Sequence, residues 1–125
     1  MITVARTSLD FIETPGGNFG AGSATPSRGS KEVSVIYQRQ SPGGANPLHT
    51  HDREEVMVVI AGEITVAGGG DPVKLGHGDS LIVPAGQPHR IENSGEAPAE
   101  WLLIAPAGVR FFHENGVEGT PPWAR

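Results

Sequence analysis

The stretch that decides the fold reads Gly43-Gly-Ala-Asn-Pro-Leu-His49-Thr-His51-Asp-Arg-Glu-Glu55-Val-Met-Val-Val-Ile-Ala-Gly62. Two imidazoles alternate across one residue, and a carboxylate follows four residues after the second. Residues i and i+2 of a β-strand project from the same face, so His49 and His51 point the same way. Imidazole and carboxylate together suit a divalent first-row metal ion. Taken alone, however, a His-x-His pair is more simply explained as two polar residues at a strand end.

The composition favours an all-β fold. A chain of 125 residues has the length of one domain. Its 18 glycines and 11 prolines are spread along the chain rather than pooled in one tract. This spread is typical of many short strands separated by turns.

Charge and composition also exclude several classes of partner. The net charge of −5 and the pI near 5.4 argue against nucleic acid, which needs a basic face. No apolar run approaches the roughly 18 residues that span a bilayer, and the first residues do not resemble a secretion signal. The absence of cysteine excludes disulfides, thiolate metal sites and a cysteine nucleophile, and it fits a cytoplasmic protein.

Short runs of β-forming residues follow one another between Gly and Pro turns. Val33, Val35 and Tyr37 alternate with Ser34 and Ile36 in the first of them. No stretch has a long amphipathic helical period. The pattern predicts a small barrel or jelly roll, with strands near 33–40, 48–52, 55–61, 64–67, 73–75, 80–83, 89–93 and 100–105.

The two ends of the chain are less regular. Residues 1–32 are expected to form an N-terminal arm in which 1–12 pairs as an edge strand and 14–31 is a loop. That loop is expected to cover the core, to exchange with a partner subunit or to act as a lid. Residues 33–106 form the barrel and 107–125 a C-terminal tail, in which 109–113 is a strand end or one helical turn. Trp123 packs on the body or a partner, or caps the mouth of the barrel.

A second group of residues supplies another imidazole. Gly78, Pro84 and Gly86 precede His89, and Asn93 follows it. The Pro-x-Gly turn reverses the chain, and His89 opens the next predicted strand. A metal ion shared by His49, His51 and His89 would join two separate hairpins.

These two stretches resemble the two motifs of the cupins. The first cupin motif is Gly, five residues, His-x-His, three or four residues, Glu, six residues, Gly, and residues 43–62 match it without a gap. The second is Gly, five residues, Pro-x-Gly, two residues, His, three residues, Asn, and residues 78–93 match it. The 15 residues between them are the short spacer of small single-domain cupins (the cupin 2, conserved β-barrel family). With the flanking strands, the resemblance extends over roughly 33–106.

The resemblance implies a double-stranded β-helix, a jelly-roll barrel, with one divalent metal ion inside. The ion would be Fe, Mn, Ni, Zn or Cu, and its ligands His49, His51, Glu55 and His89. Glu54 is the competing carboxylate, but the motif spacing favours Glu55. Such a ligand set leaves coordination positions open, as catalytic sites do. Glu55 would also act catalytically, as a general base.

Other candidates are weaker. His77 and His113 match no ligand position and are expected at the surface. Gln87 and Asn93 are best placed by sequence to orient the ligands. The candidates for pocket lining, each also explained by core packing, are Tyr37, Met57, Gln87, Ile91 and Trp101, with Gln38, Arg39 and Leu103 as further possibilities.

The fold alone does not choose a reaction. The first hypothesis is a dioxygenase acting on an enol, catechol or diketone. The second is a non-redox isomerase, lyase or cyclase that uses the metal as a Lewis acid. The third is a module that binds a small ligand or metal without catalysis. A small-molecule substrate and a homodimer are expected, because cupins of this size are commonly dimers and exposed sheet edges need covering.

Overall fold

The computed structural model describes residues 1–125, and β-strands form nearly all of its regular structure. Only three short 3-10 helices interrupt the strands: η1 (Arg6–Ser8), η2 (Pro26–Arg28) and η3 (Pro122–Ala124). None of these helices is long and apolar enough to cross a membrane. The all-β jelly roll expected from the sequence is confirmed.

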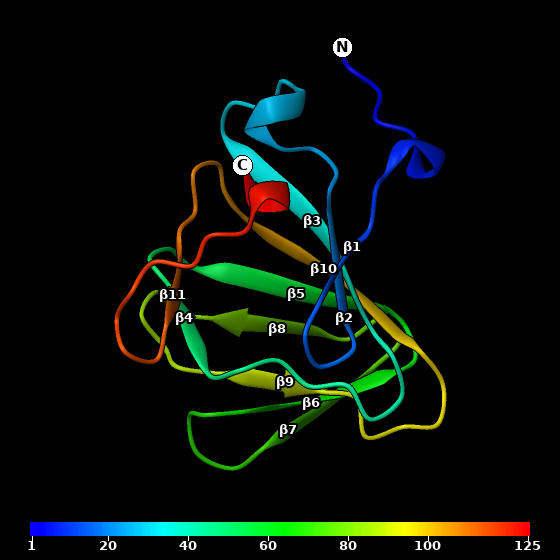
Figure 1. Cartoon of the computed structure of the whole chain (residues 1–125), viewed down its shortest axis with the longest axis vertical. Helices are drawn as coiled ribbons and strands as arrows, with labels where there is room; N and C mark the ends of the chain where they lie inside the picture. The colour runs from blue at the N-terminus through cyan, green and yellow to red at the C-terminus, as the bar shows by residue number, and fades with distance from the viewer.

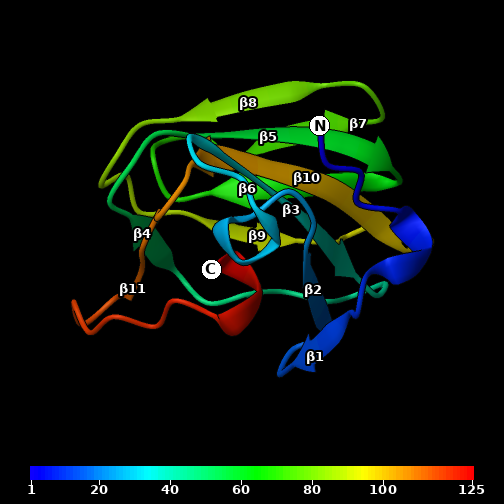
Figure 2. The same ribbon diagram turned by 90° about the horizontal axis from the view of Figure 1, so that it is seen from above.

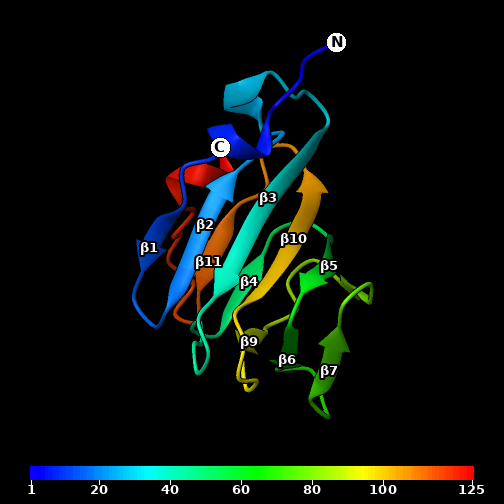
Figure 3. The same ribbon diagram turned by 90° about the vertical axis from the view of Figure 1, so that its right-hand side faces the viewer.

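The larger layer is a six-stranded antiparallel sheet in the order β1-β2-β3-β10-β5-β8. Figure 3 shows β1, β2, β3 and β10 side by side in this layer. Its strands are β1 (Ile12–Thr14), β2 (Asn18–Gly22), β3 (Val33–Gln40), β10 (Ala99–Pro106), β5 (Glu55–Ala61) and β8 (Ser80–Val83).

The smaller layer consists of two short sheets, β7-β6-β9 and β11-β4. Antiparallel bridges at Ala45–Glu92 and His49–His89 join them into one surface, which lies opposite the larger sheet (Figures 1 and 2). Its strands are β7 (Val73–Gly76), β6 (Glu63–Ala67), β9 (Arg90–Glu92), β4 (His49–His51) and β11 (Phe111–His113). The His49–His89 bridge therefore lies where the two short sheets meet.

The main core lies between the two layers. Burial alternates along β5 and β10, so every second side chain points inward. The inward side chains of six strands, β5 to β10, form one apolar cluster, made of Met57, Val59, Ile64, Val66, Leu75, Val83, Ile91, Ala99 and Trp101. This cluster fills the end of the barrel towards which β5 runs.

The expected loop over 14–31 is wrong in part, because residues 18–22 form β2 and 26–28 form η2. The strand was missed because Asn-Phe-Gly-Ala-Gly has low β propensity. Its glycines have a packing role: a Cβ on Gly20 or Gly22 would collide with Trp123. Small residues on one face of β2 thus leave room for the C-terminal tail. The edge strand expected within 1–12 is displaced: β1 is Ile12–Thr14, and of the expected range only Ile12 belongs to it, while residues 6–8 form η1.

The tail packs back on the barrel. Of the two alternatives for 109–113, the strand is correct, and β11 pairs with β4. Helix η3 contacts β2 and β3 and brings Trp123 over the inner face of β2.

Candidate metal centre and cavity

Three imidazoles converge at the other end of the barrel, as the sequence predicts. His49 and His51 come from β4, and His89 precedes β9. One nitrogen from each ring lies within 4.8 Å of those of the other two. The ring centroids of His49 and His89 are 4.3 Å apart, and those of His49 and His51 5.1 Å. This cluster can hold a metal ion.

The backbone holds the two motifs together. His49 and His89 exchange two N–H···O hydrogen bonds of 3.0 Å each. The amide of Gly86 donates to the carbonyl of His51 over 2.8 Å. Gly86 has φ +77°, a conformation that only glycine adopts without strain. The Pro-x-Gly turn therefore sets His89 against His49 before any ion binds.

Two main-chain carbonyls determine which ring nitrogen of His49 and of His89 is unprotonated. His49 Nδ1 lies 2.8 Å from the carbonyl oxygen of Pro47, and His89 Nδ1 lies 2.9 Å from that of Gln87. A carbonyl oxygen only accepts, so each Nδ1 donates. The lone pair of the neutral ring then resides on Nε2 and is free for a metal ion. Gln87 thus orients a ligand, as expected, but through its backbone.

Glu55 faces two of the imidazoles from the first residue of β5. Its side chain is 1% exposed, with Oε2 at 2.7 Å from His51 Nδ1 and Oε1 at 2.7 Å from His89 Nε2. Although these distances are short, neither contact has hydrogen-bond geometry, and both carboxylate oxygens, His51 Nδ1 and His89 Nε2 are left without a partner. In the contact between His89 and Glu55, the lone pair of Nε2 faces a carboxylate oxygen. This contact is repulsive unless a cation or a proton lies between the two atoms.

The electrostatics of this group favour ion binding at neutral pH. Burial, helped by the neighbouring His89, lowers the pKa of His49 from 6.5 to about 4, so this ring is neutral. Burial alone would raise the pKa of Glu55, but His51 and His89 reverse that effect and lower it to about 2. Burial likewise acts to lower the pKa of His89, and the Glu55 carboxylate outweighs it, so the pKa is raised. The neutral ring of His49 and the ionised Glu55 carboxylate are donors that suit a first-row divalent ion, and a proton held by His89 has to leave before its Nε2 can bind that ion.

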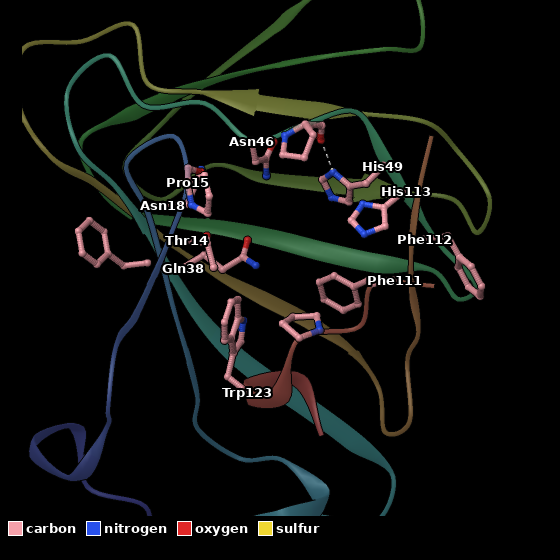
Figure 4. Close-up of a pocket in the computed structure, with 14 residues that line it drawn as sticks. Thr14, Pro15, Asn18, Gln38, Asn46, His49, Phe111, Phe112, His113 and Trp123 are labelled. Atoms are coloured by element: carbon pink, nitrogen blue, oxygen red, sulfur yellow. Dashed lines mark hydrogen bonds between the residues drawn. The ribbon is translucent and has the colours of Figure 1, made fainter. Parts of the chain in front are cut away.

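A cavity of about 340 Å³ opens beside His49. In Figure 4, His49, Gln38, Phe111 and Trp123 surround the same space. The lining contains no Asp, Glu, Lys or Arg, and of the four candidate ligands it contains only His49. The lining residues are Thr14, Pro15, Asn18, Phe19, Gln38, Asn46, Pro47, His49, Phe111, Phe112, His113, Gly119, Pro121 and Trp123.

The five main candidates for pocket lining do not line this cavity. Met57, Ile91 and Trp101 are buried in the apolar cluster, because it occupies the barrel interior directly beyond the ligands. Tyr37 faces away from the barrel interior and packs its ring against Phe11.

Gln87, the fifth main candidate, and two of the further candidates also lie elsewhere. The side chain of Gln87 turns to the carbonyls of Gly68 and Pro88. Arg39 stacks on Phe11 and Phe19, and Leu103 belongs to a second apolar cluster. Of all the candidates only Gln38 lines the cavity. It alternates with Tyr37 on β3, so the strand pattern of inward Ser34 and Ile36 identifies it.

The structure also places the remaining candidates. Asn93 is buried and donates to the carbonyls of Gln40 and Ala97, so it holds the backbone rather than an imidazole. His77 and His113 are exposed as expected, but His113 also lines the cavity. Trp123 lines it too, in agreement with the alternative that this residue caps the mouth. Phe111, which stacks on His51 at 4.1 Å, was not singled out in the sequence, because only the β11–β4 pairing brings the two together.

Comparisons with known proteins agree with the geometry. The model of the cupin domain family matches residues 36–105. Auxin-binding protein 4 of Zea mays is 32% identical over 85 residues, which are 61% of this chain and 42% of that protein. Germin-like protein 3-8 of Oryza sativa is matched over 33% of its length. The chain therefore spans less than half the length of these two relatives.

Two other similar proteins are covered more fully. The tetracenomycin polyketide synthase protein TcmJ of Streptomyces glaucescens is 30% identical over 109 residues, 86% of this chain and 73% of that protein. The structure of the polyketide cyclase RemF from Streptomyces resistomycificus superposes with a TM-score of 0.76 at 22% identity, over 87% of this chain and 81% of that chain. The superposition places the fold among the double-stranded β-helices.

Proposed function

Because the chain belongs to the cupin family, we propose that it binds one divalent transition-metal ion through His49, His51, His89 and Glu55 and acts as an enzyme on a small oxygenated molecule. The observation that carries the proposal is the set of four buried nitrogen and oxygen atoms that face one another without hydrogen-bonding partners. Buried polar atoms are almost always paired in proteins, so a group of this kind calls for a metal ion or a shared proton between its atoms, and we propose the metal ion. When bound, such an ion supplies Lewis-acid chemistry, and a redox-active ion also supplies electron-transfer chemistry.

The chain's own residues divide the remaining tasks. His51, His89 and Glu55 are buried, so the site is reached only past His49, which lines the cavity. Both oxygens of Glu55 face imidazoles, and a carboxylate with a pKa of about 2 is a weak base. We therefore assign Glu55 to the metal ion and not to proton abstraction. Of the other lining side chains, His113 alone is an imidazole, the group best suited to proton transfer near neutral pH, and we assign it that role.

For the reaction, we favour non-redox cyclisation or isomerisation of an enolisable aromatic substrate over the dioxygenase hypothesis that the sequence alone put first. The support is the similarity to a polyketide synthase protein over 86% of this chain. The two hypotheses share the metal site and differ in whether dioxygen is consumed.

The test uses 8-hydroxy-1-tetralone, a flat molecule with a chelating pair of oxygens and an enolisable CH₂ group. The protein is loaded separately with Fe²⁺, Mn²⁺, Ni²⁺ and Zn²⁺, with His89→Ala as the control. We expect faster deuterium exchange at the CH₂ group, detected by NMR, without dioxygen uptake, and a loss of this exchange in His89→Ala and His113→Gln. Stoichiometric dioxygen uptake would favour the dioxygenase, and no turnover of either kind would favour a binding module.

We also propose that two copies associate through the outer face of the larger sheet. Two cross-strand rows there consist almost entirely of apolar side chains, and Ile82 is 65% exposed. A mainly apolar sheet face of this kind suits a two-fold interface. The rows are Val35, Ile104, Val56 and Ile82, and Tyr37, Leu102, Val58 and Ser80. Sedimentation equilibrium is expected to give a dimer for wild type and for Val117→Glu, and a monomer for Ile104→Glu. A wild-type monomer would overturn the proposal.

A cytoplasmic location stays a prediction from the sequence.

A further inference from the structure

We propose that the cavity binds a flat, uncharged aromatic molecule, holds its oxygen atoms with the side-chain amides of Gln38 and Asn46, and stacks its ring on the indole of Trp123. The inference deepens the proposed function, on which it rests for the reaction, by naming the substrate class and the residues that select it.

The polar groups of the wall are available because the chain does not use them. The amide of Gln40, two residues along β3, donates to Asn18 Oδ1 and to the carbonyl of Ile91, whereas Gln38 makes no side-chain hydrogen bond. Asn46 Oδ1 accepts from the amide of Ile91 over 2.7 Å, which leaves the Nδ2 donor of Asn46 without a partner in the chain. Two amides of the lining can therefore bind a ligand.

The indole of Trp123 lies beside these amides. Its ring packs against Gly20, where a Cβ would collide with it, and Gly20 is the cross-strand partner of Gln38. Directly opposite residues of neighbouring strands are about 5 Å apart at Cβ, so the indole ring and the Gln38 amide belong to the same part of the wall. The Nε1 atom itself is buried, so the ring and not the N–H is the part of Trp123 that a ligand can contact.

The rest of the lining favours a flat apolar molecule. The rings of Phe111 and Trp123 face the cavity (Figure 4), Phe112 and Pro121 are also among its lining residues, and planar groups stack well on aromatic surfaces. The lining has neither Lys nor Arg, the residues that bind phosphate and carboxylate groups. It has no acidic group to bind a cation. The wall itself therefore disfavours sugar phosphates and aromatic acids, whereas a neutral phenol or aryl ketone fits both the stacking surface and the unpaired amides.

The test measures binding rather than turnover. Isothermal titration with 8-hydroxy-1-tetralone is compared with 1-hydroxy-2-naphthoate, an aromatic anion, and with glucose 6-phosphate. In metal-stripped wild type we expect the neutral probe to bind at least about 10-fold more tightly than either anion. Gln38→Leu should weaken binding of the probe by about 10-fold, since it removes a hydrogen bond and keeps the apolar surface. Trp123→Phe should weaken it by several-fold, since the smaller ring offers less surface for stacking. Asn115→Leu, an exposed amide outside the cavity, should leave binding unchanged.

Thermal melting followed by circular dichroism identifies any variant that does not fold. If Gln38→Leu does not fold, the binding measurement on Trp123→Phe provides the test. Tighter binding of either anion, or unchanged affinity in both wall variants, would overturn the inference. Using metal-stripped protein separates the two proposals. If the probe depends on Gln38 but no metal binds, only the proposed function fails. If one metal ion binds but neither wall variant affects the probe, only the present inference fails.

Discussion

Strand β5 runs from one end of the barrel to the other, and its inward side chains change from a carboxylate at Glu55 to apolar groups at Met57 and Val59. At the far end they pack into one apolar cluster. At the near end, Glu55 meets His51 and His89 with no hydrogen bond between them. The same alternation of the strand therefore produces stability in one half and a reactive group in the other. Unpaired buried atoms cost about 1–3 kcal/mol of stability each. The half of the barrel that holds the apolar cluster (the packed half) therefore has to offset the destabilisation caused by the half that holds the three imidazoles and Glu55 (the metal half).

The largest effect on stability is expected in the packed half. Trp101 is 1% exposed at the centre of the apolar cluster, and Trp101→Ala should lower the free energy of unfolding by about 3–5 kcal/mol. Trp101→Phe keeps an aromatic ring and removes an indole N–H that has no partner, so it should cost far less. Urea unfolding measures both. Equal losses in the two variants would contradict a role based on packing.

The metal half should instead determine how stability depends on pH. In metal-stripped protein the pKa of Glu55 is about 2, against an ordinary value of 4.5. The unfolded chain therefore takes up this proton first, so the stabilisation is complete above pH 4.5 and is lost as the pH falls towards 2. Wild type should lose about 2 kcal/mol more than Glu55→Gln between pH 6 and pH 3. Parallel losses in thermal unfolding would show that Glu55 is not held ionised by its neighbours.

Two glycines with positive φ allow the two ends of the barrel to be compared through substitutions with smaller expected effects on stability. Gly62, with φ +69°, ends β5 at the packed end, and a Cβ there would lie 2.6 Å from the carbonyl oxygen of Pro98. Gly86, with φ +77°, precedes His89 and has open space around it. Gly86→Ala should cost about 1 kcal/mol, the strain of a left-handed residue, and Gly62→Ala at least about twice as much. Chemical denaturation measures both, and a larger loss at Gly86 would contradict this ranking.

Much of the barrel and the metal half was predictable because both depend on local patterns. The motif spacing determines on which face of a strand each candidate ligand lies and where the turns fall. The candidates are His49, His51, Glu55 and His89, and the three imidazoles do converge. Strand β3 was expected over the residues where it lies, because its alternation is regular. Strand β2 was missed, since a strand of small residues forms only through its partners.

The cavity was harder to predict because its walls come from segments far apart in sequence. Phe111 and Trp123 reach it only through the pairing of β11 with β4 and the packing of the tail on Gly20. Met57, Ile91 and Trp101 have the parity of inward residues, but parity does not tell how far along the barrel the open space extends. Depth along a barrel is a property of packing, and a single sequence does not encode it locally.

The central claim is that the metal half is completed by one ion. Calorimetric titration of metal-stripped protein with Co²⁺, alongside His51→Ala, tests it directly. We expect one ion per wild-type chain, a raised midpoint of thermal unfolding on binding, and affinity at least about 100-fold weaker in the variant. No binding by wild type, or equal binding by His51→Ala, would contradict it.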